Sequence, residues 1–128
     1  MKWTWSQTGS GEDGNVPGIR RQMIDLIRRR RRKARFTSHR PTEIRPWEVI
    51  HPQSGLPFQD AMMWRGISQL LDQGVPLRRV SLRQPRGEEA WECLARLGPD
   101  APLVYIKLQI LGSQVLLRSF HEAEYDDD

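Results

Sequence analysis

The sequence has one cysteine among its 128 residues and no long apolar run, and these two absences exclude several classes of protein. A single thiol, Cys93, can form neither an internal disulfide nor a cysteine cluster for zinc, and we expect it to be a packed apolar residue. No apolar stretch approaches the roughly 18 to 20 residues that span a bilayer, and the N-terminus lacks the apolar block of a signal peptide. Metal-ligand spacings, phosphate-binding glycine loops and Ser-His-Asp arrangements are missing as well. We therefore expect a cytoplasmic protein without membrane contact, metal or cofactor.

A chain of this length can bury one modest core. Residues 1–18 are rich in Gly, Ser, Thr and Asn and show no sustained period, which predicts a flexible N-terminal arm. Residues 19–122 are predicted to form a single α+β domain, and residues 123–128 an acidic tail.

The net charge of +4 is unevenly distributed. Residues 20–45 contain eleven Arg or Lys and two acidic residues, whereas five of the last seven residues are acidic. This asymmetry indicates a polyanionic partner, with the tail screening the basic surface when no partner is bound.

Two helices are predicted. A short apolar stripe beginning near Ile19 and the good helix propensity of arginine predict a first helix that continues through the arginines and ends by Pro41. A second helix is predicted at residues 57–73, and Gly74 with Pro76 should end it.

The pattern then changes to the alternation of strands. It predicts strands at residues 77–82 and 89–97 and a β-hairpin over residues 104–121. The order of elements predicts an α+β fold, with an antiparallel meander of about four strands and two or more helices packed on one face.

The arginine run, residues 28–35, would place cations all round the predicted helix, which suits phosphate contacts better than packing. Such contacts hold nucleic acid without reading its sequence, although a solvated or protein-binding segment has the same composition. The RNA-binding residues expected from this run and from the strand after the second helix are Arg28, Arg29, Arg31, Arg32, Lys33, Arg35, Arg79 and Arg83.

Polar residues interrupt the apolar positions of the hairpin, and the length of its turn decides how they meet. A two-residue turn at residues 112–113 places Arg118 on the face of Lys107 and His121 on the opposite face. A three-residue turn places His121 opposite Tyr105 instead. Because a slip of one residue exchanges the faces of a strand, both registers stay open.

The order of residue types in the two strands of the hairpin is similar to that of a known protein family. The pattern has valine, tyrosine, an aliphatic residue and lysine in one strand, and serine, phenylalanine, a basic residue and glutamate in the other: Val104, Tyr105, Ile106, Lys107, Ser119, Phe120, His121 and Glu122. It resembles the C-terminal hairpin of MqsR-type toxins, which are RelE-like ribonucleases of bacterial toxin-antitoxin pairs. The predicted elements from residue 57 onward fall in that family's order.

The resemblance implies metal-independent cleavage of messenger RNA and a RelE-like fold. In that reaction the ribose 2′-hydroxyl attacks the neighbouring phosphate, which requires a base, an acid and cations. By position, Tyr105 matches the family's tyrosine and His121 stands where the family has a catalytic lysine, and this match favours the three-residue turn. Glu92 falls where the family has a functional glutamine, and Arg79 lies near the position of a second lysine.

We therefore expect an RNA-cleaving toxin, a metal-independent endoribonuclease in which His121, Tyr105, Lys107 and Arg118 carry out or support catalysis. Its partners would be messenger RNA and a cognate protein antitoxin, and a homodimer is left open. A non-catalytic RNA- or DNA-binding protein, or a protein-interaction module with an acidic partner, would explain the same cations.

Overall fold

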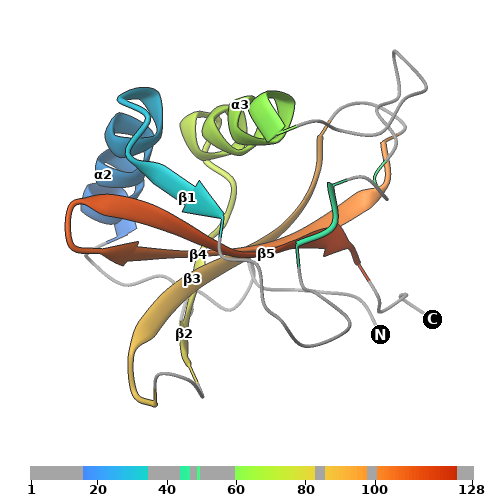
Figure 1. Ribbon diagram of the computed structural model, residues 1–128. Helices are drawn as coiled ribbons and strands as arrows, with labels where there is room; N and C mark the ends of the chain where they lie inside the picture. Colours follow the sequence, from blue (N-terminus) through green and yellow to red (C-terminus); the bar gives the residue numbers. More distant parts are fainter. Residues whose placement is uncertain are drawn as a thin grey trace.

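A computed structural model describes two helices and five strands of the chain, in residues 16–34, 44–46, 49, 60–82, 86–97 and 101–123. The elements are α2 (Val16–Arg28), β1 (Arg32–Ala34), α3 (Asp60–Asp72), β2 (Arg78–Ser81), β3 (Glu89–Arg96), β4 (Leu103–Leu111) and β5 (Gln114–Glu122). Both helices lie on one side of the sheet (Figure 1). The predicted α+β class is therefore confirmed.

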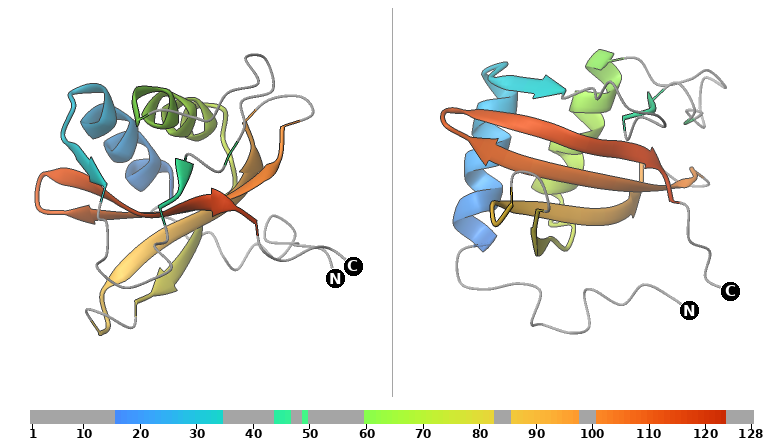
Figure 2. Two further views of the ribbon diagram at one scale, coloured as in Figure 1. Left: turned by 45° about the vertical axis from the view of Figure 1, so that its right-hand side comes forward. Right: turned by 60° about the horizontal axis from the view of Figure 1, so that its bottom comes forward.

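The strands form one sheet in the order β1-β5-β4-β3-β2. β1 runs parallel to β5, and the other neighbours are antiparallel. The prediction of a four-stranded antiparallel meander is thus wrong, because β1 adds a parallel strand from the N-terminal part of the chain. Figure 2 shows that the sheet is twisted, so that β2 and β3 diverge in direction from β1 and β5.

The core lies between the helices and the sheet. The helices contribute the apolar stripes that the sequence predicts, with these buried side chains: Met23, Ile27, Met63, Trp64, Ile67, Leu70 and Leu71. The sheet contributes the residues of its central strands that face the helices: Trp91, Cys93, Val104, Ile106, Leu108, Val115, Leu117 and Phe120. Alternation along each strand leaves the intervening side chains on the face away from the helices.

α2 ends at Arg28, so the prediction that the first helix continues towards Pro41 is wrong. Arg30 adopts a φ of +62°, its N–H donates to the carbonyl of Ile27 at 3.0 Å, and the N–H of Arg31 donates to the carbonyl of Leu26 at 2.8 Å. This is the Schellman pattern that ends a helix. Strand pairing outweighs the helix propensity of arginine here, because the next residues hydrogen-bond to the edge of β5.

The end of α3 follows the sequence prediction. Gly74 has a φ of +87°, and the N–H of Val75 donates to the carbonyl of Leu70 at 3.0 Å. Glycine adopts this left-handed conformation without the steric cost of a Cβ atom. β2 then begins at Arg78, as the change of pattern predicts.

The outer edge of β5 is paired by two separate segments. The N–H of Val115 donates to the carbonyl of Arg31 at 2.9 Å, and further along β5 the N–H of Arg45 donates to the carbonyl of Phe120 at 2.7 Å. Ile44 forms a parallel bridge to Phe120 and is fully buried. No helix in the described part of the chain is long and apolar enough to cross a membrane.

The predicted arm falls almost entirely outside the described residues, although its last three residues, 16–18, belong to α2. The tail beyond residue 123 also lies outside them. The proposed division into arm, domain and tail therefore stays a prediction.

Candidate active site

The hairpin of β4 and β5 has a two-residue turn. Leu111 pairs with Gln114 across residues 112–113, and Gly112 has a φ of +63°, as glycine commonly has in tight hairpin turns. The three-residue turn is therefore wrong. The consequence expected from that longer turn nevertheless holds, because Tyr105 pairs with His121.

A β-bulge reconciles these two observations. Leu108 pairs with Leu117, whereas the preceding residue Lys107 pairs with Ser119, so that Arg118 is the extra residue of β5. Leu117 and Phe120 are both fully buried in the core. A regular strand would have one outward-facing residue between two inward-facing ones, but here two residues, Arg118 and Ser119, lie between Leu117 and Phe120. Arg118 therefore lies on the same face as Lys107, and His121 still pairs with Tyr105.

All four predicted catalytic residues thus share the sheet face away from the helices. Neither register considered from the sequence allowed this, since each placed Arg118 and His121 on opposite faces. We call the residues that gather there the polar face: Glu92, Tyr105, Lys107, Gln109, Arg118 and His121. Neither described helix covers this face (Figures 1 and 2).

Glu92 is the member of the polar face on β3 and is only 6% exposed. The hydroxyl of Tyr105 donates to its Oε2, and the Nε of Arg78 lies 3.4 Å from its Oε1. A buried carboxylate requires such partners, because burial without them is costly. The two contacts fix the carboxylate and, through it, the ring of Tyr105.

His121 lies beside Tyr105 and is 5% exposed. The two ring centroids are 5.4 Å apart, and the planes are tilted by 38°. The Nδ1 of His121 is 2.8 Å from the carbonyl oxygen of Glu122. Because a carbonyl only accepts, Nδ1 is the nitrogen that carries the hydrogen in this contact. In the neutral ring, Nε2 is then the atom that can accept a proton.

Two cationic side chains, Lys107 and Arg118, lie on the same face as Tyr105 and His121. Lys107 pairs with Glu92 on one side and Ser119 on the other, and its Nζ is 5.9 Å from the centre of the Tyr105 ring. Arg118 is held by the buried amide of Gln109, because its Nη1 donates to Oε1 at 3.0 Å.

The orientation of that amide is fixed by a second contact. The Nε2 of Gln109 donates to the Oε1 of Glu88 at 2.8 Å, which leaves the amide oxygen for the guanidinium of Arg118. Gln109 is 3% exposed. A chain of hydrogen bonds from Glu88, just before β3, through β4 to β5 therefore determines where the guanidinium lies.

The predicted RNA-binding residues of the arginine run do not all lie on one surface, because the chain changes from helix to strand within the run. Arg28, Arg29 and Arg31 are exposed at the end of α2 and in the turn that follows. The side chain of Arg32 is half-buried, donates to the carbonyl of Ile27 at 3.0 Å and lies 5.6 Å from the ring of Trp64 on the helix side of the sheet.

Lys33 is exposed and pairs with Leu116, which precedes Arg118 on the polar face. Arg35 and Arg83 lie outside the described residues. Arg79 lies on β2, at the opposite edge of the sheet from β1, and its Nη1 is 3.4 Å from the Oε2 of Glu89. The structure therefore does not bring Arg79 to the arginine run.

The sequence alone did not assign roles to Gln109 and Glu88, and it named Glu92 only through the resemblance. A signal for Glu92 was present, because a glutamate between Trp91 and Cys93 interrupts an otherwise apolar strand. Charged residues are rarely buried unless they are paired.

Burial raises the pKa of the Cys93 thiol to about 12, with a further contribution from the charge of Glu92 that Arg20 opposes. A thiol with this pKa is protonated at neutral pH and is a poor nucleophile, and the prediction of a packed residue is confirmed. Among the described residues, no three His, Cys, Asp or Glu side chains gather closely enough to hold a metal ion.

The fold and site define an α+β domain whose mixed sheet carries helices on one face and a cluster of acid-base and cationic side chains on the other. Compared with protein-family models, curated proteins and solved structures, the chain matches none of them.

Proposed function

We propose that this chain is an RNA-cleaving toxin of the MqsR type, with a RelE-like fold: a metal-independent endoribonuclease that acts on messenger RNA. One observation carries the proposal. The bulge at Arg118 keeps His121 opposite Tyr105 and brings Arg118 to the face that already carries Lys107. Cleavage by a ribose 2′-hydroxyl requires this combination of a proton acceptor, a proton donor and positive charge.

In the proposed reaction, Nε2 of His121 takes the proton of the 2′-hydroxyl as the oxygen bonds to phosphorus. The bond from phosphorus to the 5′-oxygen breaks, and the hydroxyl of Tyr105 gives its proton to that oxygen. The products are a 2′,3′-cyclic phosphate and a 5′-hydroxyl end. Lys107 and Arg118 stabilise the negative charge that develops on the phosphate oxygens.

Glu92 has a positioning role in this scheme. Its carboxylate accepts a hydrogen bond from the Tyr105 hydroxyl before substrate binds and so holds the tyrosine ring beside His121. The hydroxyl must turn from Glu92 to the 5′-oxygen for proton transfer.

The direct test is incubation of the purified protein with RNA in EDTA, beside His121→Ala. We expect fragments with cyclic phosphate ends from the wild type and intact RNA from the variant. Arg65→Ala is the matched control, because Arg65 is exposed on α3, away from the polar face, and its loss should leave cleavage unchanged.

Other outcomes would identify the rival functions. Tight binding of RNA that stays intact would mean a non-catalytic nucleic-acid-binding protein. Absence of RNA affinity even at low salt, where phosphate contacts are strongest, would favour a protein-interaction module. The toxin assignment further predicts that expression arrests growth and that a cognate antitoxin, encoded beside this chain, relieves the arrest.

A further inference from the structure

Five exposed cations gather where α2 ends and β1 begins: Arg28, Arg29, Arg30, Arg31 and Lys33. We call this group the basic corner. Among the residues that the structure describes, Asp25 lies 3.4 Å from Arg29, and both side chains are more than half exposed, so the pair contributes little. The negative end of the helix dipole favours cations only within the last turn, and Arg31 and Lys33 lie beyond it. The local fold therefore does not account for this concentration of charge.

β1 connects the basic corner to the polar face. The carbonyl of Arg31 accepts the N–H of Val115, and Lys33 pairs with the next residue of β5. Further along β5 come Arg118 and then Ser119, which pairs with Lys107. Cations thus follow one another along β5 until His121.

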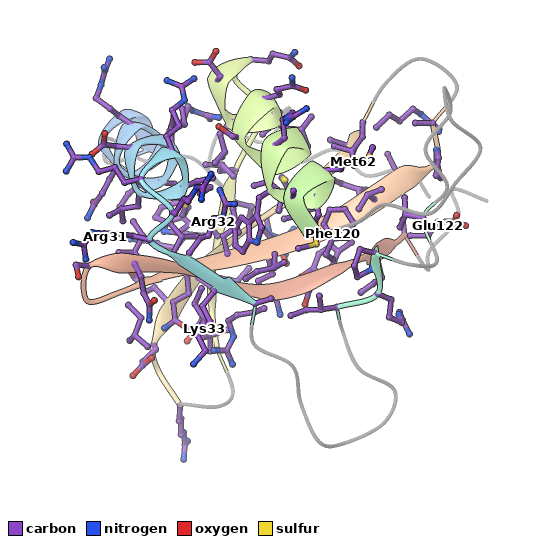
Figure 3. All side chains as sticks on the ribbon, turned by 45° about the horizontal axis from the view of Figure 1, so that its top comes forward. Arg31, Arg32, Lys33, Met62, Phe120 and Glu122 are labelled. Atoms are coloured by element: carbon purple, nitrogen blue, oxygen red, sulfur yellow. The ribbon has the colours of Figure 1, made fainter. Side chains whose placement is uncertain are left out.

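Figure 3 agrees with this order. In Figure 3, Arg31 lies near the hairpin turn and Glu122 at the other end of β5, while Lys33 is labelled on the side of the sheet away from the helices. The path from Val115 to His121 is about 20 Å long, because each strand residue adds about 3.4 Å. A single strand of stacked nucleotides with about 3.4 Å per nucleotide covers this path with about six nucleotides.

We propose that the basic corner is a second RNA-binding site, which holds single-stranded RNA on one side of the phosphate that lies at His121. The cations of β1, β5 and β4 succeed one another in the direction of β5, and one phosphate backbone matches such a succession better than the two backbones of a duplex do. This inference rests on the proposed ribonuclease function for the identity of the ligand. It adds a length requirement: a good substrate extends about six nucleotides from the cleaved bond towards the corner.

Binding of 2′-O-methyl RNA to the full chain tests the inference, because this RNA lacks the attacking hydroxyl and cannot be cleaved. Fluorescence anisotropy with single strands of about 4, 8 and 12 nucleotides should show affinity that rises steeply between the first two lengths. In the triple variant Arg28→Gln, Arg29→Gln, Arg31→Gln, this rise should disappear. The slope of log affinity against log salt should also become shallower by about 2, since each lost contact removes about 0.7.

The matched control removes the same charge elsewhere. Arg21, Arg65 and Arg86 are exposed outside the basic corner, and their triple change to Gln should keep the dependence on length. Equal losses in the two triple variants, or a wild-type affinity independent of length, would overturn the proposal. Circular dichroism of both variants reports whether they fold. If the corner binds as expected but natural RNA stays intact, the second site stands and the ribonuclease function fails.

Discussion

At the scale of single residues, the contact between the Tyr105 hydroxyl and the Glu92 carboxylate is central to the polar face. Tyr105→Phe should lower the free energy of unfolding by about 1 to 3 kcal/mol, because the buried carboxylate loses a donor. Urea unfolding measures this change. In a cycle with Glu92→Gln, we expect the two changes to be non-additive by at least about 0.5 kcal/mol. Strict additivity would show that the contact does not stabilise the fold.

Cys93 provides a pH-dependent test of burial. The unfolded chain loses this thiol proton from about pH 9, whereas the folded protein keeps it until about pH 12. Between these values the folded state binds more protons, so its stability must fall as pH rises. Relative to Cys93→Ala, the wild type should lose up to about 1.4 kcal/mol per pH unit in this window. Urea titrations of both proteins from pH 8 upward measure the difference, and parallel curves would contradict the burial of the thiol.

At the scale of elements, the end of α2 depends on an arginine in a conformation that favours glycine. Arg30→Gly should raise the free energy of unfolding by about 1 kcal/mol, because a Cβ atom is strained at a φ of +62°. Thermal or urea unfolding measures the gain. Arg30→Ala keeps the Cβ and removes the rest of the side chain with its charge, so it should give much less. Equal stabilisation by both variants would mean that charge, rather than backbone strain, is relieved.

The bulge in β5 is the second element with a testable role. Deleting Arg118 should leave the pairing of Tyr105 with His121 intact, because Leu117 and Ser119 would then follow one another in a regular ladder. The deletion variant should fold, with circular dichroism and a melting temperature close to those of the wild type, but should lose RNA cleavage.

Deleting Ser119 instead is the matched control for the bulge. It also restores a regular ladder, but it leaves Arg118 opposite Lys107, so more activity should survive. If both deletions abolish folding, the bulge is required for the sheet itself and not only for the placement of Arg118.

At the scale of the whole molecule, the two edges of the sheet differ in charge. The β2 edge carries Arg78 and Arg79, each with a glutamate contact, whereas the β1 edge carries the basic corner. RNA that binds along β1 and β5 must stabilise the folded state by mass action. At about tenfold excess over the dissociation constant, 2′-O-methyl RNA should add about 1.4 kcal/mol, which raises the melting temperature by several degrees. An unchanged melting temperature would contradict binding to the folded protein.

The sequence by itself determined the elements whose signals are local. The alternation of apolar residues defined β2, β3 and the hairpin, and Gly74 defined the end of α3. The α+β class followed from their order. The pattern of the hairpin also selected the four residues of the candidate site, because those side chains interrupt an apolar strand.

Only the tertiary structure decided where the arginine run goes and how the hairpin pairs. Helix propensity favoured a continuous helix through the run, but the unpaired edge of β5 offers backbone hydrogen bonds that a strand at residues 32–34 can make. The bulge likewise depends on contacts with other parts of the chain. The side chains of Leu117 and Phe120 are both buried in the core, while the side chain of Arg118 donates a hydrogen bond to Gln109 on the opposite face of the sheet. The alternation of apolar and polar residues in the sequence cannot reveal a bulge, because it assumes that successive side chains always point to opposite faces of the sheet. Contacts between neighbouring strands decide where an extra residue breaks that alternation.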